Sequence, residues 1–162
     1  MLASIVALSI ASQAAAGELT KPSATDGDVA ALHQLWDRYQ QAVARKDAKE
    51  LLGLYVSDSA PVMGGFAPRS YTLIVAANKQ PIPRTLTLTA KENVAGEVKL
   101  PPDEITNLSI HTDGEVGSVS FDYAAKVGHG QIIWSTVRTN DGWKIASVLY
   151  SINVPAADEK RS

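Results

Sequence analysis

The C-terminal third of the chain is patterned as β-strands. Apolar or aromatic residues alternate there with polar ones, which places one set of side chains on each face of a sheet. Tight turns at Asp113-Gly114 and Asn140-Asp141-Gly142 separate neighbouring segments. The alternation predicts an antiparallel meander of four strands. These strands are residues 105–111, 118–123, 131–139 and 143–154.

A helical pattern precedes these strands. Between residues 28 and 45, apolar side chains recur at intervals of three and four, which forms one stripe along a helix. Thr25 or Asp26 can cap its N-terminus. Asp47 begins a second helix, with Glu50 at the capping-box position. The stripe consists of Val29, Leu32, Leu35, Trp36, Tyr39, Ala42 and Val43.

The middle of the chain is less regular. Residues 59–66 predict a short strand that ends at Gly64-Gly65. Five prolines interrupt residues 67–103, where Tyr71 to Ala77 fits either a helix or a strand. Thr89 begins a helical segment that runs to Glu97.

These elements together predict an α+β fold in which an antiparallel sheet packs on N-terminal helices, as one domain over residues 28–155. The run from Leu2 to Ala11 is uncharged, mostly apolar and followed by small residues, which is typical of a signal peptide. We expect a signal peptide over residues 1–16, a flexible lead-in over 17–27 and a disordered tail over 156–162. The mature protein is then expected to be periplasmic or secreted.

Composition narrows the range of functions. The formal net charge is −2 and no basic run is present, so we expect no nucleic-acid partner. The chain has no cysteine, which excludes disulfides, thiolate metal sites and a cysteine nucleophile. The three histidines share no spacing that suits a metal. We expect no metal site, no cofactor and no membrane association after signal cleavage.

Several stretches carry a resemblance to a known family. With the order of elements, they resemble the nuclear transport factor 2-like superfamily, which includes SnoaL-like proteins and ketosteroid isomerase, and in particular its exported, uncharacterised bacterial members. The resemblance implies a cone-shaped fold, with the curved sheet wrapped around a pocket. The stretches are Arg38-Tyr39 with Asp47 and Asp58-Ser59-Ala60, then Val119-Ser120-Phe121-Asp122-Tyr123, and Asp141-Gly142-Trp143-Lys144-Ile145.

The resemblance also allows the functional residues of the isomerase branch to be compared with this sequence one position at a time. Tyr39 matches the tyrosine that donates a hydrogen bond to the substrate carbonyl in the isomerase branch. The general-base aspartate of that branch falls on Met63, and its second donor falls on Ser135. Met63 cannot accept a proton, and enolisation needs a base within reach. The resemblance thus argues against an isomerase of that kind and leaves Tyr39 as a weak catalytic candidate.

The same resemblance implies a pocket wall that is apolar and carries a few hydroxyl groups, as small-molecule sites do. A filled core made of the same residues is the alternative. The expected wall consists of Trp36, Tyr39, Met63, Phe66, Val119, Phe121, Tyr123, Ser135, Val137, Val148, Tyr150 and Ile152.

The opposite face of the sheet is also expected to be apolar. Strict alternation places Ile132, Trp134, Ile145 and Leu149 on it together. An apolar outer face on a small domain marks an interface, so we expect a homodimer through this face. Scattered surface hydrophobic residues are the alternative.

Three functions remain open. The favoured one is an exported domain that binds a small apolar or aromatic molecule without turning it over. The others are an isomerase, dehydratase or cyclase with Tyr39 as hydrogen-bond donor, and a non-catalytic dimeric interaction module. Glu92 and Glu97 bear on this choice, because a carboxylate pointing into an apolar pocket has a raised pKa and becomes a candidate base. The alternative for both is a solvated charged helix face.

Overall fold

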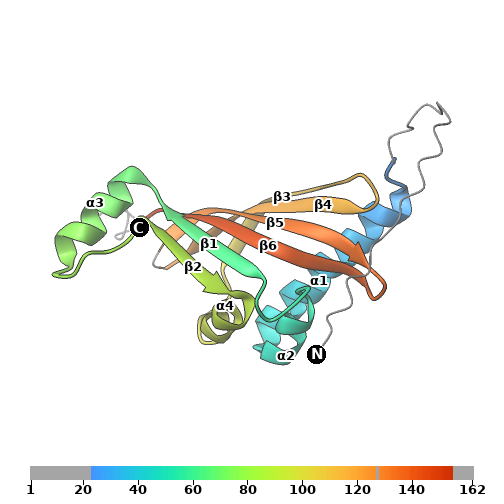
Figure 1. The fold of residues 1–162 in the computed structure, drawn as a ribbon, viewed down its shortest axis with the longest axis horizontal. Helices are drawn as coiled ribbons and strands as arrows, with labels where there is room; N and C mark the ends of the chain where they lie inside the picture. The colour runs from blue at the N-terminus through green and yellow to red at the C-terminus, as the bar shows by residue number, and fades with distance from the viewer. Residues whose placement is uncertain (1–22, 127, 155–162) are drawn as a thin grey trace, which may run out of the picture.

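The computed structural model describes residues 23–126 and 128–154 (Figure 1). Its helices and strands form the α+β fold that the sequence predicts. Helix α1 begins at Asp26, inside the expected lead-in, while the expected signal peptide (1–16) and tail (156–162) lie outside the described residues. The elements are α1 (Asp26–Arg45), α2 (Ala48–Gly53), β1 (Pro61–Phe66), α3 (Pro68–Ala77), β2 (Thr85–Thr89), α4 (Ala90–Glu97), β3 (Glu104–Thr112), β4 (Val116–Ala125), β5 (Gly128–Thr139) and β6 (Gly142–Ile152).

The first two helices begin at the caps that the sequence predicts. The Thr25 hydroxyl accepts a hydrogen bond from the Asp28 amide at 3.3 Å, and the Asp28 carboxylate accepts one from the Thr25 amide at 2.9 Å. The Asp47 carboxylate accepts one from the Glu50 amide at 3.0 Å. Lys46 lies between the helices with a left-handed backbone (φ 55°), which ends α1 and redirects the chain into α2.

The six strands form one curled, unclosed sheet in the order β2-β1-β6-β5-β4-β3. Strands β3 to β6 form the predicted antiparallel meander. The sheet as a whole is mixed, because β1 pairs parallel to β6 while it pairs antiparallel to β2. The sequence predicts the antiparallel meander and does not predict this one parallel pairing. It joins residues more than 80 positions apart, in the register Val62 to Val148, and no local signal in the sequence marks it.

The proline-rich middle folds into α3, β2 and α4. Tyr71 to Ala77 is helical, which resolves the ambiguity of that segment. Strand β2 was not anticipated, although its sequence Thr-Leu-Thr-Leu-Thr alternates strictly. Helix α4 begins where the sequence predicts, because Thr89 and Glu92 form a capping box. Helices α1, α2 and α4 lie together on one side of the sheet, and α3 lies at its far end (Figure 1).

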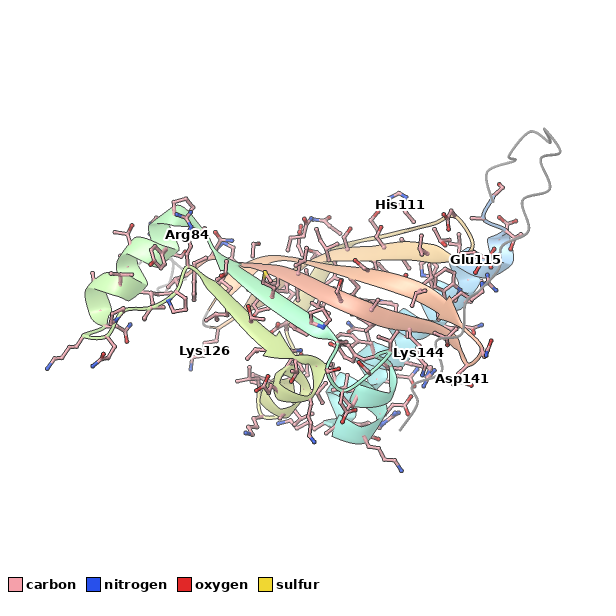
Figure 2. The ribbon with its side chains drawn as sticks, viewed as in Figure 1. Arg84, His111, Glu115, Lys126, Asp141 and Lys144 are labelled. Atoms are coloured by element: carbon pink, nitrogen blue, oxygen red, sulfur yellow. The ribbon has the colours of Figure 1, made fainter. Side chains whose placement is uncertain are left out.

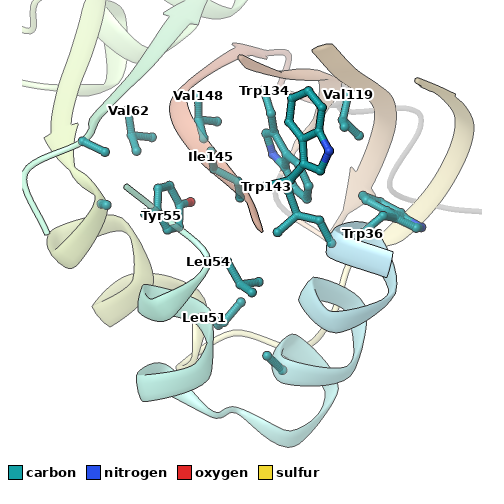
Figure 3. Close-up of a cluster of buried hydrophobic side chains, with 14 of the residues drawn as sticks. Trp36, Leu51, Leu54, Tyr55, Val62, Val119, Trp134, Trp143, Ile145 and Val148 are labelled. Carbon is teal, nitrogen blue, oxygen red and sulfur yellow. The ribbon is translucent and has the colours of Figure 1, made fainter. Parts of the chain in front are cut away.

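The hydrophobic core fills the space between α1, α2, α4 and the sheet (Figure 3). Three aromatic rings lie at its centre. The ring centroids of Trp36 and Phe121 are 4.6 Å apart, and Trp134 lies 5.5 Å from Trp36 and 5.4 Å from Phe121. Offset and edge-on contacts at these distances stabilise a core beyond simple burial of area.

The expected dimer face is wrong in register. Trp134 is 1% exposed and Ile145 is 0% exposed, and both point toward the helices (Figure 3). Ile132 packs against the same core. Leu149, at 51% exposed, is the only one of the four predicted residues on the outer face. A β-bulge explains part of the error, because Ser135 pairs with Ser147 while Thr136 pairs with Ile145. The extra residue between them reverses which face the rest of β6 presents.

On β5 the error has a different cause. Ile132, Ile133 and Trp134 are consecutive apolar residues, so alternation alone does not say which of them face inward. Trp134 pairs with Val119, and Val119 is fully buried. Directly opposed residues share a face, which brings Trp134 into the core.

Within the described ranges, no helix is long and apolar enough to cross a bilayer.

Candidate functional site

A cavity of about 250 Å³ lies between the helices and the inner face of β4, β5 and β6. Five of the side chains that line it are aromatic: Tyr39, Tyr55, Tyr123, Trp134 and Tyr150. Aliphatic residues from the ends of the strands complete the apolar part of the wall. The polar part comes from α4 and the loop after it, through Asn93, Glu97 and Asp103.

Glu97 is the last residue of α4, and its carboxylate reaches the cavity. The Tyr39 hydroxyl donates a long hydrogen bond of 3.5 Å to Glu97 Oε1. Burial raises the pKa of the Glu97 carboxyl, and the negative charge of nearby Asp103 raises it further. The hydrogen bond from Tyr39 acts in the opposite direction but is the smaller effect. Glu97 is therefore a carboxyl group that holds its proton more tightly than an exposed glutamate does.

Asp103 lies in the loop between α4 and β3 and is only partly exposed. Burial raises the pKa of its carboxyl group as well. Among the described residues, neither Glu97 nor Asp103 forms a salt bridge with a lysine, arginine or histidine. The cavity thus holds two carboxyl groups that no described lysine, arginine or histidine neutralises.

The tyrosines of the wall remain protonated at neutral pH. Burial raises the pKa of Tyr55 and of Tyr123 to about 12 each, and raises the pKa of Tyr39 well above its usual value. The negative charge of Glu97 adds to the effect at Tyr39. The Tyr123 hydroxyl donates to the Ser151 carbonyl oxygen at 3.0 Å. At neutral pH these side chains are hydrogen-bond donors and not bases.

The structure brings together some of the predicted pocket residues. Tyr39, Tyr123, Val148, Tyr150 and Ile152 line the cavity. Among them, the Tyr39 hydroxyl donates its hydrogen bond to Glu97.

Other predicted wall residues lie in the core behind the cavity. Trp36, Val119 and Phe121 are buried among the core side chains and do not line it. For these three, the alternative of a filled core describes the structure. Phe66 is on the inner face at the end of β1, where its ring lies 6.5 Å from that of Tyr71, away from the cavity.

Three predicted wall residues lie on the outer face. Met63 is 41% exposed and pairs with Leu149, which points the same way. Ser135 and Val137 belong to the outer set of β5, because Trp134 and Thr136 on either side of Ser135 are buried. The assignment of Met63 and Ser135 to the two isomerase positions is therefore wrong in register, and neither side chain reaches the cavity.

The sequence leaves Glu97 open between a pocket carboxylate and a solvated helix face, and the structure places it at the cavity. A local signal was nevertheless present. Ala90 and Val94 are buried on α4, and Glu97 follows Val94 by three positions, which places it on the same helix face. Glu92, by contrast, is exposed and caps the helix by accepting from the Thr89 amide at 2.8 Å.

The part of the chain that the structure describes contains no cluster of three or more histidine, cysteine, aspartate or glutamate side chains that could hold a metal ion. The chemistry available in the cavity is that of two carboxyl groups, several phenol hydroxyls and aromatic surfaces. Such a set can bind a small molecule by contact with its apolar body and by hydrogen bonds or charge at one end. It can also transfer a proton through Glu97.

Comparison with known proteins relates the chain to others by fold. No family model matches it, and no curated protein matches its sequence significantly. A nuclear transport factor 2-like protein of unknown function from Shewanella baltica superposes with a TM-score of 0.61 at 11% identity, over 83% of this chain and all of the other. A protein of unknown function of the DUF3225 family from Pectobacterium atrosepticum gives a TM-score of 0.58 at 17% identity, over 85% and 99%.

A candidate dehydratase of the nuclear transport factor 2-like family from Streptomyces avermitilis gives a TM-score of 0.52 at 16% identity, over 80% of this chain and 99% of the other. The TM-scores establish a shared fold. They do not transfer an activity, because this fold supports unrelated functions.

Proposed function

We propose that this chain, which has the nuclear transport factor 2-like cone fold, binds a small and largely apolar organic molecule in the cavity beneath its sheet. The observation that carries the proposal is the composition of the wall. Most of the wall is formed by aromatic and aliphatic side chains, and the carboxyl and amide groups are confined to α4 and the following loop. A wall of this kind provides apolar contact area and a small number of polar groups that orient a ligand.

The size of the cavity limits the ligand. A volume of about 250 Å³ equals that of about eight water molecules at ~30 Å³ each. It suits a molecule with a single ring and a short substituent, and it is smaller than the cavities of about 300–1,000 Å³ that hold drug-sized ligands.

A pair of alanines on β4 provides the test. Ala125 lines the cavity, and its neighbour Ala124 is exposed on the other face of the strand. Ala125→Phe fills part of the cavity, and Ala124→Phe adds the same ring outside it. In ligand-observed NMR with small aromatic alcohols, ketones and amines, we expect saturation transfer from the wild type and from Ala124→Phe and none from Ala125→Phe. Absence of transfer to every compound would contradict the proposal.

Proton-transfer catalysis is a second candidate, and the contact between Tyr39 and Glu97 favours it. Glu97 has a raised pKa, as a carboxyl base that works near neutral pH requires. A protonated tyrosine beside it can donate to a carbonyl oxygen of the substrate as negative charge develops there. The similarity in fold to a candidate dehydratase is consistent with this chemistry.

Exchange of the α-protons of small cyclic ketones in heavy water tests this candidate. If Glu97 is the base, we expect Glu97→Gln to lower the exchange rate by about 10²–10⁴-fold. Glu104→Gln removes the same charge from an exposed position on β3 and is expected to have no effect. Binding without any exchange in the wild type would exclude the catalytic candidate and leave the binding proposal intact.

We also propose that the protein is exported, on the basis of the apolar segment at residues 2–11.

We further propose a homodimer through the outer face of the sheet. The residues that support a dimer differ from those that the sequence predicts. Met63, Leu149 and Ile133 are 41%, 51% and 38% exposed and form one row, because Met63 pairs with Leu149 and Leu149 pairs with Ile133. Such a row of exposed apolar side chains is typical of an interface.

A further inference from the structure

The cavity combines two features that each favour positive charge in a ligand. The first is its aromatic wall. Tyr39, Tyr55, Tyr123, Trp134 and Tyr150 all line it. The face of an aromatic ring is electron-rich and attracts a cation, and a set of such rings is the usual binding site for ammonium groups.

The second feature is charge. Glu97 and Asp103 both reach the cavity, and none of the described residues that line it is a lysine, arginine or histidine. Neither carboxylate has a basic partner within salt-bridge distance among the described residues. A partly buried carboxylate without a partner is unfavourable, because it loses hydration and gains no opposite charge in return.

The charge of a ligand determines how it interacts with the aromatic wall and the two carboxylates. An anionic ligand is repelled by both carboxylates. A neutral ligand fills the apolar space but leaves the two carboxylates uncompensated. A cation with an apolar body suits both the carboxylates and the aromatic wall. Its charge interacts with the carboxylates and the rings, while its body occupies the rest of the cavity.

We infer that the molecule bound in the cavity is an organic cation, namely a small amine or quaternary ammonium compound with an apolar or aromatic body. This inference rests on the proposed function and names the class of ligand. Glu97 and Asp103 supply the opposing charge at the α4 side, and the tyrosines and Trp134 supply the aromatic surface. Tyr39 holds Glu97 in place through its hydroxyl.

Three probes of one shape and different charge test the inference. Phenyltrimethylammonium is a cation, tert-butylbenzene is its neutral isostere, and phenylphosphonate is an anion with the same number of non-hydrogen atoms. Binding is measured by isothermal titration calorimetry and by tryptophan fluorescence, because one of the three tryptophans, Trp134, lines the cavity. We expect the cation to bind the wild type at least tenfold more tightly than tert-butylbenzene, and the anion not to bind.

Variants then locate the effect. Glu97→Gln keeps the shape of the side chain and removes its charge, so we expect it to weaken binding of the cation at least tenfold and to leave tert-butylbenzene unaffected. Asp103→Asn is a second variant with the same expected direction. The matched control is Glu104→Gln, which removes a carboxylate that is next to Asp103 in sequence but exposed on the outer face of β3. We expect no change in cation affinity from this control beyond twofold.

The outcomes separate the inference from the proposed function. If tert-butylbenzene binds as tightly as the cation and Ala125→Phe abolishes its binding, the cavity binds ligands but the charge inference is overturned. If Glu97→Gln and Glu104→Gln lower the affinity for the cation equally, the inference is also overturned. The same holds if the anion binds most tightly. If no probe binds, both the inference and the proposed function fail. The comparison of probes on the wild type decides the question even if a variant does not fold.

Discussion

Glu97 is the residue on which the chemistry of this protein depends. It follows two buried positions on one face of α4, so the helix that buries Ala90 and Val94 also carries a carboxyl group to the cavity. Burial and the charge of Asp103 both raise its pKa. Its place in the cavity allows Glu97 to bind a ligand or to transfer a proton. Burial of the ionised carboxylate also lowers the free energy of unfolding at neutral pH.

Stability should therefore depend on pH through Glu97. A carboxyl group whose pKa is raised by folding binds its proton more tightly in the folded chain than in the unfolded one. Its contribution is most favourable below its ordinary pKa of 4.5 and is lost as pH rises through the raised value. We expect Glu97→Gln to raise the thermal unfolding midpoint at pH 7 and to leave it unchanged at pH 3.5, as followed by circular dichroism.

Glu104→Gln is the control for this measurement, because Glu104 is exposed. Its effect on the unfolding midpoint should be small at both pH values. A Glu97→Gln variant that is less stable than the wild type at pH 7 would show that the carboxylate is compensated by a partner.

At the scale of elements, the pairing of β1 with β6 positions one wall of the cavity. Gly64 pairs with Tyr150, and a Cβ atom at Gly64 would lie 2.5 Å from Tyr150 Cζ. The Tyr150 ring therefore lies across the bare backbone of β1, and only a glycine allows this close approach. The next residue, Gly65, has no atom within 4 Å of the same position.

These two glycines make a matched pair of substitutions. We expect Gly64→Ala to displace the Tyr150 ring and to lower the free energy of unfolding by about 1–3 kcal/mol, the usual cost of overpacking. The displaced ring should also reduce ligand affinity. Gly65→Ala adds the same methyl group to open space and should change stability by less than about 0.5 kcal/mol. Urea denaturation measures both, and equal effects of the two substitutions would contradict the contact.

A second element-scale prediction concerns the start of α4. The Thr89 hydroxyl accepts from the Glu92 amide at 3.2 Å and donates to the Glu92 carboxylate at 2.8 Å. Thr89→Ala removes this cap and should lower the free energy of unfolding by about 0.5–2 kcal/mol in urea denaturation. Thr87→Ala, at an exposed position on the same strand, is the control. A loss no larger than that of the control would show that the cap contributes nothing.

At the scale of the whole molecule, the two faces of the sheet differ in what covers them and in the side chains they carry. The inner face meets the helices and the cavity. The outer face of β1, β5 and β6 carries Met63, Ile133 and Leu149 among small hydroxyl-bearing residues. Charged side chains such as Asp141 and Lys144 lie toward the β5–β6 turn, and His111 projects from β3 at the edge of the sheet (Figure 2).

An uncharged patch in the middle of a sheet suits a partner surface that is equally uncharged, and a second copy of the same face meets this condition. We expect light scattering to show that the wild type is a dimer at micromolar concentration and that Leu149→Glu is a monomer. The substitution places one negative charge from each copy in an apolar contact. Val116→Glu is the control, since Val116 is 54% exposed on β4 outside the row of Met63, Leu149 and Ile133. A monomeric wild type would contradict the dimer.

The sequence by itself determined the elements whose signals are local. Caps at Thr25, Asp47 and Thr89 mark the start of three helices, because a side chain and an amide three residues away decide a cap. The turn at Asn140-Asp141-Gly142 and the alternation around it determine the hairpin of β5 and β6. These features, with the order of elements, were enough to predict the fold class.

Only the tertiary structure decided which face each strand buries. Where Ile132, Ile133 and Trp134 follow one another, the strand pairing selects the buried set, and the bulge in β6 changes it again within one strand. The placement of Glu97 in the cavity was decided in the same way, by the packing of α4 against a sheet built from distant residues. Contacts between residues far apart in the sequence set these choices, and the local pattern is compatible with more than one of them.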